Sequence, residues 1–297
     1  MKKEIFLIII AAIFYGTITV GGQFLANLGL SLYEIALFPI SVIAILMSLI
    51  VIYKRKFLIK KVMLRFFIIY GLIGAILQVT QFGGIILGVP VAVVAFLLYT
   101  QPIWTTIVGK ITLQEKITPK KVLAVIIGFM GIFVLLKPWD IENIGNLGGI
   151  SFALVAGFFL SLWVIWGRKS GINKQHYITT TFGYAFFSTM WLWLLLPVSS
   201  LFLQNSMMRI SFDFPAYYWF YVIFFAFLWG IISHPFFYAG VKKVPASIAG
   251  IILLLEPVSA SILAALLFGQ PITANIIFGG ILILLSNYLI IPKRGKK

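Results

Sequence analysis

Ten long apolar segments restrict the fold of this chain more than any other feature of its sequence. Each segment has about 17 to 27 residues, near the roughly 20 that an α-helix needs to cross the hydrocarbon core of a bilayer. Only 10% of the residues are charged, against about 25% in an average soluble domain. The sequence therefore predicts an all-α integral membrane protein with ten transmembrane helices, at residues 4–25, 32–53, 64–87, 90–111, 120–136, 147–167, 177–203, 216–240, 245–268 and 272–291.

The positive charge of the chain is distributed unevenly between the two sides of this ten-helix arrangement. Of the 23 lysines and arginines, only Lys137 and Arg209 fall on the side away from the termini, where Asp140, Glu142 and Asp213 also lie. Cytoplasmic loops of membrane proteins carry the excess of Lys and Arg, so we expect both termini in the cytoplasm and a multi-pass protein of the cell membrane. A net charge of +16 would suggest nucleic acid as a partner of a soluble protein, but here topology explains it and we expect none.

The sequence contains an internal repeat that relates the fourth and ninth predicted helices. Residues 90–118 align without a gap with residues 245–273, which pairs Pro102 with Pro257 and Gln101 with Glu256. Five helices separate the copies, and because five is odd the copies must cross the membrane in opposite directions. The sequence thus predicts two inverted five-helix repeats, residues 1–140 and 141–297, an arrangement by which many secondary carriers place one site at the midplane.

The two copies also carry the residues of a family resemblance. The first copy reads Leu98-Tyr99-Thr100-Gln101-Pro102 and then Leu113-Gln114-Glu115-Lys116-Ile117-Thr118, and the second reads Glu256-Pro257 and then Phe268-Gly269-Gln270-Pro271-Ile272-Thr273. With these motifs and the helix count, the chain resembles the two-repeat, EamA-type branch of the drug/metabolite transporter superfamily. The family pattern at the turns is similar to Gly-Glu-x-Leu/Ile-Thr or Ser. Here Gln114 replaces the glycine of the first copy, and Gln270 replaces the acid of the second.

The resemblance implies an architecture and a class of activity. It implies that helices 1 to 4 and 6 to 9 surround a central cavity while helices 5 and 10 lie at the periphery. It also implies transport of small organic molecules, such as amino acids, other metabolites or drugs, commonly outward. The second helix carries Phe38-Pro39 where relatives often have an arginine, so the substrate of such a relative cannot be transferred to this chain.

Glu256 is the first candidate for a functional residue because it is the only acid well inside a predicted helix. A charged side chain at the bilayer centre costs roughly 3 kcal/mol on insertion scales, so it usually faces a wet cavity or a partner. We expect Glu256 to bind substrate or a proton. The alternative is a neutral acid bonded to a neighbouring carbonyl for packing. Pro102 and Pro257 should kink their helices, and the kink at Pro257 should leave the carbonyl of Leu253 free beside the acid.

Other polar and aromatic residues at helical depth complete the candidate site. Gln78 and Gln81 are three residues apart and so share one face of the third helix. Each candidate also has a simpler interpretation: hydrogen bonding between helices for the glutamines and His234, and core packing for the aromatic side chains. The predicted substrate-binding residues are Glu256, Gln101, Gln78, Gln81, Tyr99, His234 and Trp163. Gly131 and Gly279 favour close helix packing instead.

Three functional classes fit a chain of this kind. We expect a secondary carrier that exports small organic molecules, with the lipid bilayer and a small-molecule substrate as partners and with coupling to protons left open. A channel or facilitator is the alternative, because channels also use polar residues at the midplane. An intramembrane enzyme is less favoured, since the sequence has no cysteine, no His-Glu-x-x-His motif and no acidic pair. We expect no metal or cofactor, and a monomer or a homodimer.

Overall fold

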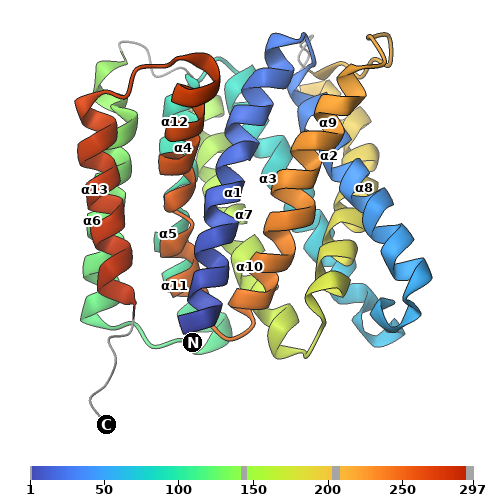
Figure 1. The fold of residues 1–297 in the computed structure, drawn as a ribbon, viewed down its shortest axis with the longest axis horizontal. Coiled ribbons are helices and arrows are strands. Elements are labelled where there is room, and N and C mark those ends of the chain that lie inside the picture. The colour runs from blue at the N-terminus through green and yellow to red at the C-terminus, as the bar shows by residue number, and fades with distance from the viewer. Residues whose placement is uncertain (1, 142–145, 203–207, 292–297) are drawn as a thin grey trace.

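The fold is a bundle of long helices that run between two opposite ends of the molecule (Figure 1). The computed structural model describes residues 2–141, 146–202 and 208–291, and within these ranges it contains helices and no strand. Glu142, one of the acids in the charge pattern, lies outside the described residues. The helices are α1 (Lys2–Asn27), α2 (Leu32–Tyr53), α3 (Leu64–Ile86), α4 (Val91–Leu98), α5 (Gln101–Leu113), α6 (Pro119–Leu136), α7 (Leu147–Ile172), α8 (Tyr177–Phe202), α9 (Tyr218–Ala226), α10 (Ser233–Val241), α11 (Ala246–Ile252), α12 (Leu255–Phe268) and α13 (Ala274–Ile290).

These helices make ten crossings of the bundle, as the apolar segments predict. Within the described part of the chain, nine segments are long and apolar enough to span a membrane, and the seventeen-residue α13 is a shorter apolar helix. Seventeen residues is still within the range that can span the hydrocarbon core. The described helices therefore agree with a membrane protein of about ten transmembrane segments.

Two crossings are interrupted at their middle by a short turn, just before Pro102 and Pro257, where the sequence predicts kinks. The fourth crossing consists of α4 and α5, separated at Tyr99 and Thr100, and the ninth consists of α11 and α12, separated at Leu253 and Leu254. The expectation that Pro257 leaves the carbonyl of Leu253 free is wrong. That carbonyl accepts the backbone N–H of Glu256 at 3.0 Å, because the chain tightens to an i→i+3 bond at the break.

Local capping explains where several helices begin. Ser31 forms a capping box with Glu34 at the start of α2: the serine hydroxyl accepts the Glu34 N–H at 3.1 Å, and the Glu34 carboxylate accepts the Ser31 N–H at 2.7 Å. Thr118 caps α6 by accepting the Lys121 N–H at 3.3 Å, ahead of proline at the first helical position. Thr273 occupies the equivalent place before α13, but its side chain makes no capping bond.

The two broken crossings run in opposite directions through the bundle. The chain descends from α4 to α5 in Figure 1 and ascends from α11 to α12. Gln114 and Gly269, which are equivalent in the sequence repeat, end α5 and α12 with the same left-handed conformation, at φ 54° and φ 66°. The start of α1 and the end of α13 lie at the same end of the bundle (Figure 1).

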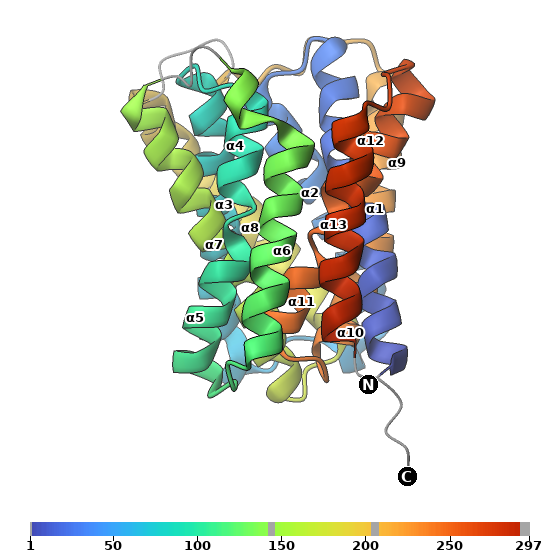
Figure 2. The same ribbon diagram turned by 90° about the vertical axis from the view of Figure 1, so that its left-hand side faces the viewer.

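Helices α6 and α13 pack side by side at one edge of the bundle (Figure 2). Their contact depends on glycine: a Cβ atom at Gly279 would lie 2.6 Å from the carbonyl oxygen of Gly131 and 2.7 Å from the Cβ of Leu135. Small residues allow this close approach of two backbones, which is a common way for helices to associate inside a membrane. The pair therefore forms a rigid flank beside the remaining crossings.

We predict that Gly279→Ala destabilises the protein, because the added methyl group meets backbone that cannot move aside. Overpacking of this kind typically costs about 1 to 3 kcal/mol. The neighbouring Gly280→Ala is a matched control, since its Cβ would lie 3.6 Å from Val258 Cγ1, an ordinary contact. Thermal unfolding of both variants in detergent tests this, and equal midpoints for the two variants would contradict the packing described here.

Candidate functional site

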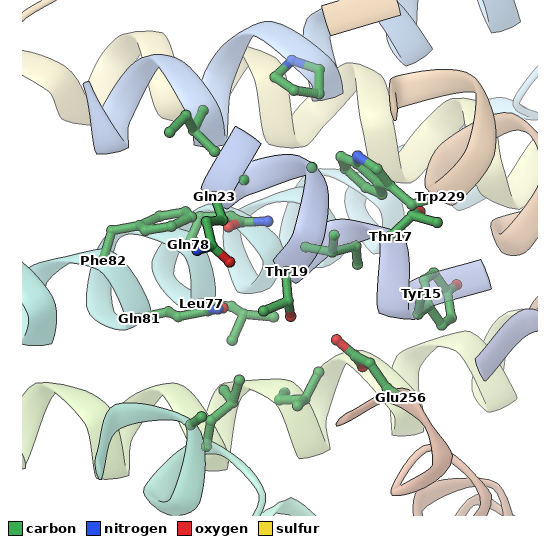
Figure 3. Close-up of a pocket in the computed structure, with 18 of the residues that line it drawn as sticks. Tyr15, Thr17, Thr19, Gln23, Leu77, Gln78, Gln81, Phe82, Trp229 and Glu256 are labelled. Carbon is green, nitrogen blue, oxygen red and sulfur yellow. The ribbon is translucent and has the colours of Figure 1, made fainter. Parts of the chain in front are cut away.

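A cavity of about 490 Å³ lies in the upper half of the bundle as drawn in Figure 1 (Figure 3). Its lining comes from α1, α2, α3, α4, α7, α8, the α9 to α10 crossing, the two helix breaks and the start of α12. Neither α6 nor α13 contributes a lining residue, in agreement with the peripheral position that the resemblance implies for helices 5 and 10. The volume is within the range of pockets that bind small organic molecules.

The cavity opens toward the end of the bundle that lies away from the termini. Its lining includes Ala26, near the end of α1, and Val91, the first residue of α4, and both residues are exposed. Thr19 and Gln23, which line the cavity deeper along α1, are exposed as well. Solvent therefore has access from this end to about the middle of the bundle.

Glu256 lies at the inner end of the cavity. It is the second residue of α12, so the helix break at Leu253 and Leu254 places its carboxyl group at mid-depth. The side chain is partly exposed to the cavity, and the Tyr99 side chain, from the other helix break, lines the cavity as well. Figure 3 shows the carboxyl group directed across the cavity toward α1, where Tyr15, Thr17 and Thr19 lie.

Packing of α12 against α1 determines this position of Glu256. The Ser259 hydroxyl is 3.0 Å from the Ile13 carbonyl oxygen of α1 and 2.8 Å from the Glu256 carbonyl oxygen. At Gly16 of α1, a Cβ atom would lie 2.8 Å from the backbone nitrogen of Ala260, so only glycine lets the helices come this close. The carboxyl group is therefore presented by a rigid helix contact.

Beneath Glu256, a layer of buried aromatic side chains closes the bundle. We call it the aromatic layer, and it consists of Tyr15, Tyr70, Trp163, Tyr184, His234, Phe237 and Tyr238. The rings pack closely: Trp163 stacks on Phe237 with centroids 4.6 Å apart, and Tyr184 stacks on His234 at 5.4 Å. The Tyr70 hydroxyl lies 3.0 Å from the Tyr238 hydroxyl. The layer thus separates the cavity from the end of the bundle that holds the termini.

Two polar atoms of this layer, the Tyr15 hydroxyl and Trp163 Nε1, are unpaired in the described part of the chain, and both residues line the cavity. Tyr15 is 3% exposed and lines the cavity, and within the described part of the chain its hydroxyl has no hydrogen-bond partner. A buried hydroxyl without a partner is costly, so such a group usually awaits water or a ligand. Tyr15 therefore belongs with Glu256 and Tyr99 in the candidate site.

A π-helical turn, Phe227–Ile232, places two further lining residues, Trp229 and His234. His234 Nδ1 lies 2.9 Å from the carbonyl oxygen of Trp229, five residues earlier in the chain. The imidazole is therefore bonded to a backbone carbonyl group of the π-helical turn. Single π-helical turns inside α-helices frequently occur at functional sites. The amino-acid pattern does not predict this turn.

Uncharged polar side chains occupy the opposite wall, between Glu256 and the cavity mouth. Gln78 and Gln81 of α3 face the cavity together, as their spacing predicts, and Thr19 and Gln23 of α1 lie beside them (Figure 3). Sequence reasoning missed Thr19 and Gln23. Tyr15, Thr19 and Gln23 follow one another at intervals of four residues, so they form a polar stripe on one face of α1. That spacing could have indicated Thr19 and Gln23. We call Thr19, Gln23, Gln78 and Gln81 the polar wall.

The structure does not bring Gln101 into the cavity with its repeat mate Glu256. Gln101 is fully buried between α5 and α11, where its amide nitrogen donates to the Thr105 hydroxyl. Gly250 of α11 allows this burial, because a Cβ there would lie 2.6 Å from that amide nitrogen. The other predicted residues, Gln78, Gln81, Tyr99, Trp163, His234 and Glu256, line the cavity. No group of three His, Asp or Glu residues that could hold a metal ion occurs in the described ranges.

Comparisons with known proteins agree with this geometry. The model of the EamA-like transporter family matches the chain twice, at residues 2–137 and 147–291. An uncharacterized transporter of Archaeoglobus fulgidus is 28% identical over 65% of this chain, and the chain spans 65% of that relative's length. An uncharacterized transporter of Clostridium kluyveri is 23% identical over 97% of this chain and 93% of the relative.

A solved crystal structure has the same fold, with a TM-score of 0.77 over 96% of each chain at 13% identity. At that identity the likeness shows the fold alone. The two family matches together cover nearly the whole chain and include every crossing of the bundle. The chain therefore belongs to the EamA-like transporter family and is a membrane transporter.

Proposed function

We propose that this transporter is a secondary carrier that exports small organic molecules by alternating access. The observation that carries the proposal is the shape of the cavity, which extends from one end of the bundle to mid-depth and stops at the aromatic layer. A carrier needs a central site that is open to one side and closed to the other. The alternative, a channel, needs a continuous path, and the stacked rings interrupt it.

The proposed orientation places the termini and the basic ends of the helices in the cytoplasm of a cell. The cavity mouth then faces outward, so the described conformation is the outward-facing one. The opposed directions of α4 to α5 and of α11 to α12 support two inverted repeats, residues 1–140 and 141–297. Export would begin from the other conformation, in which the aromatic layer opens and the mouth closes.

A contact between the two halves supports closure at the cytoplasmic end. Glu115, just after α5, accepts the backbone N–H groups of Ala246 and Ser247 at 2.5 and 3.0 Å, and the Ser247 hydroxyl at 2.5 Å. Lys121 donates to the same hydroxyl at 2.8 Å. We call this set of contacts the clasp. The equivalent position at the outer end is Gln270, which is exposed and uncharged, so it supplies no carboxylate contact like that of Glu115.

The carboxyl group of Glu256 provides the proposed coupling. It can bind a proton or the cationic group of a substrate, but not both at once, and competition for one carboxyl group is the simplest basis for exchange. A proton entering from outside would displace the substrate into the open mouth. Tyr15, Tyr99, Tyr184 and His234 are the other titratable groups that line this part of the cavity.

We predict first that cysteine labelling will follow this orientation. The chain has no native cysteine, so single cysteines report their own exposure. Lys60→Cys and Lys174→Cys should react with a membrane-impermeant thiol reagent only from the cytoplasmic side, and Asn146→Cys and Asp213→Cys only from outside. All four residues are exposed. Reaction of both pairs from the same side would rule out the arrangement.

We predict second that Glu115→Gln shifts the carrier away from the outward-facing state. A hydrogen bond to a charged group contributes about 1.5 to 3 kcal/mol, so loss of one changes the equilibrium by about tenfold or more. Spin labels at Ala26 and Val91, which both line the mouth, should then report shorter distances. Asp140→Asn removes an exposed acid outside the clasp and serves as the control. Unchanged distances in Glu115→Gln would leave the clasp as a packing contact.

We predict third that Glu256→Gln removes the pH dependence of transport. In the native protein, proton competition should weaken binding of a cationic substrate as pH falls from about 8 to 5, a window that contains the ordinary imidazole pKa and the range to which burial raises carboxyl pKa values. The variant should keep its thermal stability, lose most substrate exchange in proteoliposomes and respond little to pH. His234→Gln, the control, should keep the native pH profile. Normal transport by Glu256→Gln across that range would make Glu256 structural.

A further inference from the structure

The cavity carries a charge pattern that restricts its substrate more narrowly than the proposed function does. Its thirty lining residues include one carboxylate, that of Glu256, and no lysine or arginine, so the described lining offers an anion no fixed positive charge. The basic residues lie at the ends of the helices. A carboxylate that is partly withdrawn from water favours a cationic or hydrogen-bonding partner, and this lining contains no lysine or arginine to provide a cationic one.

Three backbone N–H groups at the break beside Glu256 do not compensate for the missing positive charge, because each is already bonded. Helix breaks in carriers often direct free N–H groups at an anionic substrate. Here the N–H groups of Leu253, Leu254 and Glu256 donate to the carbonyls of Ala249, Ile251 and Leu253 at 3.0, 3.1 and 3.0 Å. Pro257 has no N–H group. The break beside Glu256 therefore presents an anion with none of these donors.

His234 does not supply a positive group in its neutral form either. Its Nδ1 lies 2.9 Å from the Trp229 carbonyl oxygen, which can only accept, so Nδ1 carries the proton that it donates. The remaining nitrogen of the neutral ring is then an acceptor. A substrate carboxylate would meet a lone pair there and not a donor.

The same part of the cavity suits an organic cation. Tyr15, Tyr99, Trp163, Tyr184 and Trp229 surround the space near Glu256, and the negative faces of aromatic rings attract cations. Figure 3 shows Tyr15 and Thr19 close to the carboxyl group, Trp229 beyond Thr17, and the glutamines of the polar wall farther along the cavity. The polar wall can form hydrogen bonds with hydroxyl or amide groups without adding charge.

We propose that the cavity selects monovalent organic cations with an apolar or aromatic body and discriminates against zwitterionic amino acids and anions. This proposal deepens the proposed function, because it names the substrate class of the same cavity. It separates amines and cationic drugs from free amino acids, which the family resemblance leaves together. The discrimination comes from Glu256, the aromatic rings around it and the absence of a cationic side chain in the lining.

Binding of four related compounds to the purified protein in detergent tests the proposal. Phenethylamine and phenylalaninol are cations at neutral pH. Phenylalanine is a zwitterion with the carbon skeleton of phenylalaninol, and 3-phenylpropionate is an anion. Isothermal titration calorimetry should detect binding of both cations. The affinity for phenylalanine and for 3-phenylpropionate should be at least about 100-fold weaker, because the carboxylate of either compound would remain unpaired in the cavity. Binding of phenylalanine within threefold of phenylalaninol, or failure of both cations to bind, would overturn the proposal.

Three variants make the test specific to the named residues. Glu256→Gln should weaken phenylalaninol at least tenfold, and Trp229→Leu should weaken it severalfold. Gln78→Arg adds the missing positive charge to the polar wall, so it should strengthen binding of phenylalanine and weaken binding of phenylalaninol. Gln78→Leu adds no charge and should not strengthen binding of phenylalanine. Equal effects of the two Gln78 variants on phenylalanine would contradict the electrostatic argument.

The binding test is independent of transport. Proteoliposome exchange can fail while the detergent-solubilised protein still prefers cations, which would refute the carrier and leave the charge selectivity. Conversely, exchange of phenylalanine together with its tight binding would support a carrier and refute the selectivity. The two proposals therefore have distinguishable failures.

Discussion

The need to satisfy backbone hydrogen bonds in lipid is the constraint on which this structure depends. A chain inside the hydrocarbon region must form helices, and irregular backbone is tolerated there only where protein or a water-filled cavity surrounds it. Both broken crossings meet this condition: α4 and α5 separate where Tyr99 lines the cavity, and α11 and α12 separate just before Glu256. The breaks are what bring a tyrosine hydroxyl and a carboxyl group to mid-depth.

Glycine allows the surrounding helices to support these breaks. A Cβ at Gly157 of α7 would lie 2.6 Å from the Leu97 carbonyl oxygen, and one at Gly16 of α1 would lie 2.8 Å from the backbone nitrogen of Ala260. Helix α7 of the second half therefore packs closely against the break in the fourth crossing, and α1 of the first half packs closely beside the break in the ninth crossing. This contact keeps the irregular backbone away from lipid and positions its side chains with little freedom.

The two ends of the bundle differ in ways that suit the proposed cycle. At the end with the termini, the aromatic layer and the clasp at Glu115 bring the two halves together. At the other end, exposed Gln23, Ala26 and Val91 line an open mouth, and Gln270 supplies no carboxylate equivalent to Glu115. The two repeat copies thus differ at this position, with Glu115 at the closed end and Gln270 at the open end, where an amide replaces an acid.

The sequence alone determined the helices, because the length and hydropathy of an apolar segment suffice to predict a transmembrane span. Local motifs also determined the starts of α2 and α6, and the spacing of Gln78 and Gln81 determined their common face. The tertiary structure decided which side chains of different helices meet, which the periodicity of the sequence within one helix cannot predict. It separated Gln101 from Glu256, since Gly250 lets α11 cover Gln101, and it brought Thr19 and Gln23 of α1 to the wall that holds Gln78. It also produced the π-helical turn at Trp229 and the closure of only one end. These features depend on which helices meet and how closely their backbones approach, and such contacts form only when the whole bundle packs.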